Sequence, residues 1–211
     1  MTTDITSCAK KSRGRPKVFD REAALDKAMA LFWKHGYEAT SMAHLVEATG
    51  AKAPTLYAEF TNKEGMFKAV LDRYIARVTQ QREACLYCED RTLEQTLEDY
   101  LSLLAEMFTD KETPSGCFMI CTSAVLAVSS EDISAMIKMR QSMQEATLVH
   151  FLEQRQQKGE IPATTSVRNL AKYLCCIIQG MSISAIENAS YEELMQIVKT
   201  TLRLLPELKK I

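Results

Sequence analysis

The sequence predicts an all-α protein. Only 7 Gly and 5 Pro interrupt its 211 residues, and long stretches repeat apolar residues with the 3.6-residue period of a helix. No alternating apolar and polar segment is long enough to require a β-sheet. With 46% hydrophobic and 25% charged residues, the composition is that of a globular protein and excludes the disordered and collagen-like classes. We therefore expect helices along most of the chain.

The first two helices have clear start and stop signals. A helix begins after Asp20, a good N-cap, and continues on an apolar stripe until Gly36 ends it. Thr40 or Ser41 caps a short second helix, which covers 41–48 and ends at Gly50.

The next two helices complete the N-terminal unit. The third is short, covers 52–58 and carries Pro54 in its first turn, where the missing N–H costs nothing. Asn62 caps a long fourth helix that starts at Lys63 and reaches the low eighties.

The rest of the chain predicts further helices separated by Gly, Pro and Ser. They are Thr92–Phe108, Cys117–Val128, Glu131–Lys158, Val167–Asn188 and Tyr191–Leu205. The longest nearly uncharged stretches, at 117–128 and 174–186, fall short of the about 20 residues needed to cross a bilayer. The first residues also lack the apolar core of an export signal. We therefore expect no membrane partner and a cytoplasmic protein.

Charge is unevenly distributed along the chain, although its net value is −1. Residues 1–68 hold 11 Lys+Arg against 8 Asp+Glu, whereas residues 69–211 hold 15 against 19. Residues 1–18 are basic and lack periodicity, which predicts a flexible arm. This asymmetry is typical of a nucleic-acid-binding end joined to a second functional unit.

The two short helices also suggest nucleic-acid binding. Two short helices joined by a Gly-containing turn, with longer helices on either side, form the helix-turn-helix pattern. The spacing alone fits an ordinary helical corner equally well. The residues themselves carry a stronger signal.

The run from Ala24 to Phe67 resembles the N-terminal DNA-binding domain of TetR/AcrR-family transcriptional repressors. The shared marks keep their family spacing without a gap. They are Leu31-Phe32, Gly36-Tyr37, Thr40-Ser41, Ala48-Thr49-Gly50, Thr55-Leu56-Tyr57, Phe60 and Asn62-Lys63-Glu64. The resemblance implies a three-helix DNA-binding domain at 19–68 and an effector-binding and dimerisation domain at 69–211.

The helix-turn-helix assigns candidate contacts to double-stranded DNA. The second short helix lies in the major groove in such motifs, and helix N-termini face phosphates. The candidates are Lys52, Ala53 and Thr55 for base edges, Tyr57 for phosphate or base, and Thr40, Ser41 and Lys63 for phosphates. Pro54 and Ala58-Glu59 depart from the usual family residues, and Glu59 would repel a phosphate that it faced.

The basic arm is a second candidate DNA contact. Arg13 and Arg15 lie on a segment with Gly and Pro, directly before the first helix. Arginines on such an arm can enter a narrow A·T-rich minor groove. The alternative is a solvated tail that only adds non-specific affinity.

The C-terminal half matches the family only in outline. The resemblance implies an effector pocket in the bundle and a homodimer formed by the last two long helices. Both helices carry wide apolar stripes, which an intramolecular core would explain equally well. The stripe residues are Leu170, Leu174, Ile177, Ile178, Met181 and Ile186, then Leu194, Ile197, Val198, Leu202 and Leu205.

Two kinds of effector are compatible with this half. Many Met and Phe side chains would suit an apolar small molecule. The candidates are Met107, Phe108, Cys117, Phe118, Cys121, Met139 and Met143, with Met119, Met136 and Phe151 beside them. Cu(I) binding or thiol oxidation is the other possibility, with Cys85, Cys88, Cys117 and Cys121 as candidates. Their spacing defines no firm metal site, although the overall character resembles a copper-responsive branch of the family.

These observations favour a transcriptional repressor that releases a palindromic operator when an effector binds its C-terminal domain. We expect no catalysis and no resident cofactor. Two alternatives remain. One is a thiol-disulfide enzyme built on Cys85 and Cys88, which would normally need a βαβ context. The other is an architectural DNA-binding protein that uses the arm alone.

Overall fold

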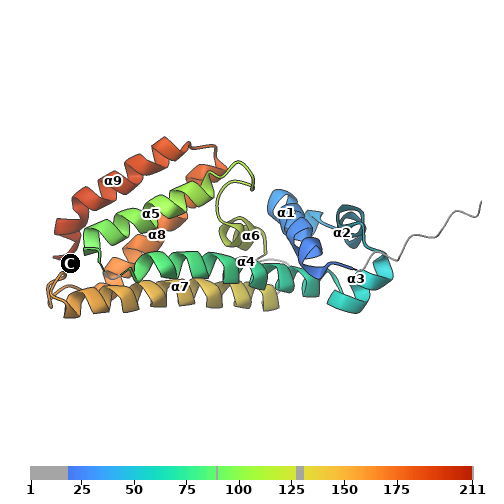
Figure 1. Ribbon diagram of the computed structural model, residues 1–211, viewed down its shortest axis with the longest axis horizontal. Helices are drawn as coiled ribbons and strands as arrows, with labels where there is room; N and C mark the ends of the chain where they lie inside the picture. The colour runs from blue at the N-terminus through green and yellow to red at the C-terminus, as the bar shows by residue number, and fades with distance from the viewer. Residues whose placement is uncertain (1–18, 89, 127–130, 211) are drawn as a thin grey trace, which may run out of the picture.

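The computed structural model describes residues 19–88, 90–126 and 131–210, and its regular structure is helical throughout these ranges (Figure 1). The helices are α1 Arg21–Ala39, α2 Met42–Thr49, α3 Ala53–Phe60, α4 Lys63–Leu86, α5 Leu93–Phe108, α6 Phe118–Leu126, α7 Glu131–Gln157, α8 Val167–Ile186 and α9 Tyr191–Leu208. The molecule is elongated. Helices α1–α3 form one end, and α4 and α7 run side by side along its length (Figure 1).

The N-terminal caps confirm the expected helix starts. The Asp20 carboxylate accepts a hydrogen bond from the backbone N–H of Ala23 at 3.0 Å. Gly36 breaks the regular helix with a φ of 79°, after which a short helical stretch continues to Ala39. At α2, the Ser41 hydroxyl and the His44 ring each accept a hydrogen bond from the other residue's backbone N–H, which forms a capping box.

The corner between α3 and α4 is tightly built. Pro54 lies in the first turn of α3, as expected, and Asn62 caps α4 by accepting from the N–H of Gly65 at 2.8 Å. A Cβ atom on Gly65 would lie 2.0 Å from the carbonyl oxygen of Phe60. Only a glycine therefore lets α4 start this close to the end of α3.

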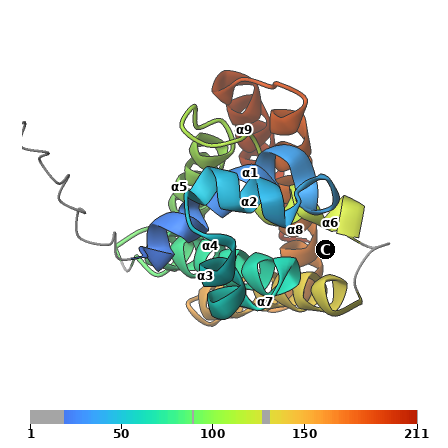
Figure 2. The same ribbon diagram turned by 90° about the vertical axis from the view of Figure 1, so that its right-hand side faces the viewer.

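Helix α4 joins the two halves without a linker. It is continuous from residue 63 to residue 86, so it passes through the boundary expected at residue 68. It packs against α1 in the N-terminal unit and against α5 and α7 in the bundle. Figure 2, which looks along the molecule from the α1–α3 end, shows the bundle helices behind this unit. The N-terminal unit thus has a rigid connection to the bundle.

Helix α8 lies inside the bundle. By length and mean hydropathy (1.2) it is the one described helix that could cross a membrane. It packs against α5, α6, α7 and α9, and 39% of its most apolar stretch is buried inside the chain.

Most side chains of the apolar stripes on α8 and α9 are buried within the same chain. Their buried members are Leu170, Leu174, Ile178, Met181, Leu194, Val198 and Leu205. These residues therefore belong to the intramolecular core, one of the two interpretations that the stripes left open. Ile183, Ile186 and Leu204 are instead the exposed large apolar side chains of the two helices. Helix α9 also runs past its expected end, to Leu208. Pro206 lies in its last turns, where a proline removes only one backbone hydrogen-bond donor and the helix can continue.

Candidate DNA interface and effector cavity

Helix α3, which packs against α2 and α4, presents a solvent-facing surface. Its Leu56 and Phe60 are buried in the core, which leaves the rest of this short helix outside. Lys52 and Tyr57 are exposed, the latter at 49%, and Ala53 and Thr55 are half-buried. Ser41 is exposed as well. Five of the predicted contact residues therefore lie on α3 or at the caps of α2 and α3, with access to solvent.

Thr40 does not fit its predicted role. Its side chain is buried, and its hydroxyl donates a hydrogen bond to the carbonyl of Gly36 at 2.8 Å. This bond satisfies the carbonyl at the point where α1 is interrupted. The hydroxyl is thus part of the turn between α1 and α2 and is not available to a phosphate.

Lys63 lies at the start of α4 and is half-buried. Its ammonium group donates to the carbonyl of Tyr37 at 3.1 Å and lies 4.1 Å from the centre of the Tyr37 ring. These contacts fix the position of the cation beside the helix N-terminus.

Glu59 has a partner that removes much of its expected repulsion toward phosphate. Its carboxylate accepts a hydrogen bond from Nε of Arg21 at 2.7 Å, and the Arg21 guanidinium lies 5.4 Å from the centre of the Phe60 ring. The ion pair lowers the local negative charge on α3. Arg13, Arg15 and the rest of the arm lie outside the described residues.

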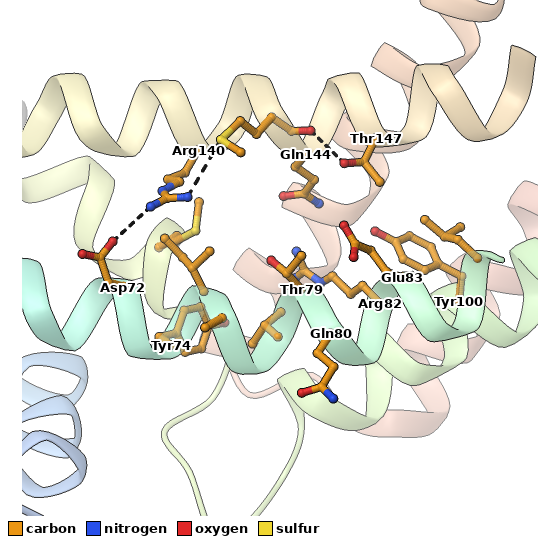
Figure 3. A pocket seen from close by; sticks show the side chains of 16 residues that line it. Asp72, Tyr74, Thr79, Gln80, Arg82, Glu83, Tyr100, Arg140, Gln144 and Thr147 are labelled. Atoms are coloured by element: carbon orange, nitrogen blue, oxygen red, sulfur yellow. Dashed lines mark hydrogen bonds and ion pairs between the residues drawn. The ribbon is translucent and has the colours of Figure 1, made fainter. Parts of the chain in front are cut away.

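A cavity of about 600 Å³ lies between α4 and α7 (Figure 3). Its volume is in the range of small-molecule sites in proteins. Its wall combines apolar and polar side chains. The lining residues are Asp72, Tyr74, Ile75, Ala76, Val78, Thr79, Gln80, Arg82, Glu83, Leu86, Tyr100, Met119, Arg140, Met143, Gln144 and Thr147.

Few of the pocket residues expected from the sequence line this cavity. Met143 and Met119 do. Phe108, Phe118 and Phe151 are fully buried core residues, Met107 and Met136 are partly buried against the core, and Met139 is 53% exposed. Large apolar residue types are favoured equally by a core and by a pocket, so type alone could not separate them.

The polar part of the cavity contains two arginines in different situations. Arg140 donates to the Asp72 carboxylate at 3.0 Å, and its Nη1 lies 3.9 Å from the sulfur of Met143 (Figure 3). Arg82 has no such partner among the described residues, and its Nε is buried without a hydrogen bond. The sequence did not single out Arg82, because a basic residue on a long polar helix is usually solvated.

An aromatic cluster connects the cavity to the N-terminal unit. The rings of Trp33 on α1, Tyr74 on α4 and Phe118 on α6 have centroids 5.4–5.6 Å apart. Tyr74 also lines the cavity, and its hydroxyl lies 3.4 Å from the sulfur of Cys117. Burial raises the pKa of Tyr74 well above its usual value. A change in the cavity can thus reach α1 through one side chain.

The cysteines do not assemble a conventional metal site. No group of three His, Cys, Asp or Glu side chains suited to a metal ion occurs within the described parts of the chain. Burial raises the pKa of the Cys85, Cys121 and Cys175 thiols, that of Cys175 to about 11. Cys88 is exposed.

A second, small cavity of about 50 Å³ has three sulfur-containing residues among those that line it. Cys117, Met119 and Cys175 all line it. Cys121 lies in a surface groove beside Trp33 and Ile183. That Cys117 and Cys175 line the same cavity was not expected, because the two residues are far apart in the sequence.

Comparison with known proteins agrees with this geometry. The model for bacterial regulatory proteins of the tetR family matches residues 24–70. The chain is 65% identical to the HTH-type transcriptional repressor ComR of Escherichia coli K12, and the match covers 100% of both chains. It is 26% identical to the HTH-type transcriptional repressor BdcR of the same organism, over 90% of this chain and 91% of BdcR.

Solved structures of the same fold include complexes with DNA. A cysteine mutant of the TetR-family regulator CifR, complexed with 26-base-pair operator DNA, has a TM-score of 0.84 and 28% identity over 90% of this chain and 98% of CifR. The chain is 65% identical to a repressor over its whole length, and its helix-turn-helix and architecture match those of the family. The chain therefore belongs to the TetR family of bacterial transcriptional regulators.

Proposed function

We propose that this repressor binds a palindromic operator through α2 and α3 and releases it when an apolar small molecule occupies the cavity between α4 and α7. The observation that carries the proposal is the position of the cavity. It lies on α4, the same continuous helix that begins at the corner with α3. Effector binding and DNA binding therefore depend on the placement of one rigid element.

The DNA-binding unit of the proposal is residues 19–68. Lys52, Ala53 and Thr55 at the start of α3 contact base edges, and Tyr57 contacts phosphate or base. Ser41 and Lys63 contact phosphates at the N-termini of α2 and α4. Arg13 and Arg15 add minor-groove contacts from the arm.

Release follows from a shift between two conformations. The effector favours the conformation in which α4 leans away from α7, and the aromatic cluster carries α1 with it. The spacing of two recognition helices then no longer matches half-sites separated by about 34 Å, one turn of DNA. The effector acts only through its different affinity for the two conformations.

The spacing argument requires two copies of the chain. Ile183, Ile186 and Leu204 provide exposed apolar surface on α8 and α9. A twofold axis through these helices would bury this surface and give the dimer two recognition helices, one from each subunit. As a DNA-bound regulator, the dimer acts in the cytoplasm.

Binding to the DNA upstream of the gene that encodes the chain tests the proposal. Fluorescence anisotropy should detect a specific complex that random DNA does not compete away at equal concentration. Addition of apolar small molecules from a panel of hydrophobic drugs should release it. A complex that no compound releases would contradict effector control, and equal affinity for random DNA would favour the architectural alternative.

Cu(I) is a second candidate effector, supported by the three sulfur side chains around the small cavity. Thiolates and thioethers are the donors that Cu(I) prefers. Cys117 and Cys175 would hold the ion with Met119, and binding would have to displace their protons. Anaerobic Cu(I) should then release DNA from the native chain but not from a Cys117→Ser, Cys175→Ser variant. Equal release from both proteins would contradict this site.

A thiol-disulfide enzyme built on Cys85 and Cys88 has less support. No β-strand occurs in the described ranges, so the usual βαβ context is missing. Burial also raises the pKa of Cys85 when a catalytic thiol needs a lowered one. Reduction of insulin disulfides by the pure protein would restore this alternative.

A further inference from the structure

The Arg82 guanidinium is the unusual feature of the cavity between α4 and α7. It lines both this cavity and the small sulfur-lined cavity beside it. No hydrogen bond or ion pair engages it within the described part of the chain, and its Nε is buried without a partner. A cation that is partly removed from water without a counter-charge costs free energy, and proteins rarely retain one without use.

The acidic groups near Arg82 do not neutralise it. Asp72, on the same cavity wall, is already paired with Arg140 at 3.0 Å. Glu83 also lines this cavity but is exposed, and Glu145 lines only the smaller cavity. Neither forms an ion pair with Arg82.

The remaining wall suits an apolar body. Ile75, Val78 and Leu86 from α4, Tyr100 from α5 and Met143 from α7 line the same cavity as Arg82. Figure 3 shows Arg82 extending from α4 between the two long helices, with Gln144 of α7 across from it. Of the two arginines that line the cavity, Arg140 is paired with Asp72, whereas Arg82 has no ion-pair partner among the described residues. An unpaired charged donor beside apolar side chains favours a ligand that carries the complementary charge.

We propose that the effector is an organic anion with an apolar body, such as an aromatic or aliphatic carboxylate, whose carboxylate pairs with Arg82. This inference rests on the proposed effector role of the cavity and adds the chemical class of the ligand. The guanidinium donates two parallel hydrogen bonds to the carboxylate, and the apolar part lies against Met143, Tyr100 and the α4 side chains. The ligand thereby supplies the counter-charge that Arg82 lacks.

Three probes with one body and different head groups test the inference. They are 4-phenylbutyrate, 4-phenylbutanol and 4-phenylbutylamine, titrated into the full-length chain at pH 7 by calorimetry. The anion should bind about tenfold or more tightly than the alcohol, and the amine should bind weakest. Equal binding of the alcohol, or tighter binding of the amine, would overturn the inference.

Matched variants assign the effect to Arg82. Arg82→Met should lose about tenfold or more of the affinity for 4-phenylbutyrate while affinity for the alcohol is kept, and Arg82→Lys should lose less. Arg77→Met is the control, because Arg77 lies on the same helix but outside this cavity. Thermal unfolding and DNA binding of each variant confirm that it folds. Unchanged affinity in a folded Arg82→Met variant would overturn the assignment.

A parallel DNA-release assay separates this inference from the proposed function. If the anion binds through Arg82 but leaves DNA bound, the ligand class stands and effector control fails. If only a neutral or cationic compound binds and releases DNA, effector control stands and the anion inference fails.

Discussion

At the scale of single residues, two contacts shape the DNA-binding unit. Gly65 permits the close corner between α3 and α4, since a Cβ there would collide with the carbonyl oxygen of Phe60. Arg21 pairs with Glu59 and so compensates the acidic residue on the recognition helix. The corner glycine lies within a recognisable sequence run, whereas the ion pair joins residues far apart and could not be read from local sequence.

Gly65→Ala should displace α3 from α4. The collision involves backbone and cannot be relieved by a side-chain rotation, so we expect a loss of about 1–3 kcal/mol of stability and at least a tenfold loss of specific DNA affinity. Urea unfolding and anisotropy measure the two effects. The control Glu64→Ala removes a surface ion pair to Lys68 and the acidic residue in the first turn of α4, and should change stability by about 1 kcal/mol or less. Native DNA affinity in Gly65→Ala would contradict the proposed role of the corner.

Arg21→Ala should weaken DNA binding because it leaves the Glu59 carboxylate uncompensated near the phosphates. The double variant with Glu59→Ala should recover most of the loss, which a double-mutant cycle at fixed salt measures directly. Additive effects of the two substitutions would show that the pair does not act as a unit on DNA.

At the scale of secondary-structure elements, the caps were predictable and the cavity was not. Asp20, Ser41 and Asn62 cap their helices through bonds to residues three positions away, so local sequence contains the whole signal. The cavity depends on the distance between α4 and α7, which many distant contacts determine together. Its polar residues were therefore missed, and core phenylalanines were assigned to it instead.

Tyr74→Leu should uncouple the cavity from the DNA-binding unit. The substitution removes the ring that contacts both Trp33 and Phe118, while it keeps an apolar side chain in the core. Effector should still bind, with DNA release reduced about tenfold or more. Trp33 is the only tryptophan, so its fluorescence reports on the cluster. Full effector-induced release in this variant would argue against the aromatic cluster as the connection.

The junction of α5 and α7 should make the bundle sensitive to acid. Burial alone would raise the pKa of Glu160. Hydrogen bonds from Arg155 and from the backbone N–H of Leu93 lower it, and their combined effect is larger, so the pKa lies below its usual value. A carboxyl with a lowered pKa in the folded state stabilises the fold above its unfolded pKa of about 4.3. That stability is lost as the pH falls through the lower, folded pKa.

Glu160→Gln tests this acid dependence. Urea unfolding of the native chain between pH 6 and pH 3 should show a fall in stability that is smaller in the variant. Parallel curves for the two proteins would contradict the assignment to Glu160.

At the scale of the whole molecule, the order of helices could be predicted but the outer surface could not. Apolar periodicity located every helix of the bundle, yet it could not tell which apolar residues face the same chain. The structure leaves Ile183 and Leu204 exposed, while most of the stripe on α8 and α9 is internal. The exposed residues define the face that a second copy would cover.

Ile183→Glu combined with Leu204→Glu should produce a monomer with weak operator binding. Light scattering after gel filtration measures the mass, and anisotropy measures the affinity. Met139→Glu is the control, because it places the same charge on an exposed apolar position of α7. A dimer that survives the double substitution would contradict this interface.

The unbroken course of α4 also limits how such a protein can change in length. Each residue inserted into an α-helix rotates everything beyond it by about 100° and advances it by about 1.5 Å. One residue inserted between the corner with α3 and the cavity would turn the bundle, and its dimer face, away from the DNA-binding unit. Seven residues, close to two full turns, would nearly restore the orientation while moving the halves apart by about 10 Å. Chimaeras that join the N-terminal unit of one such protein to the bundle of another should therefore keep the number of residues in α4 unchanged.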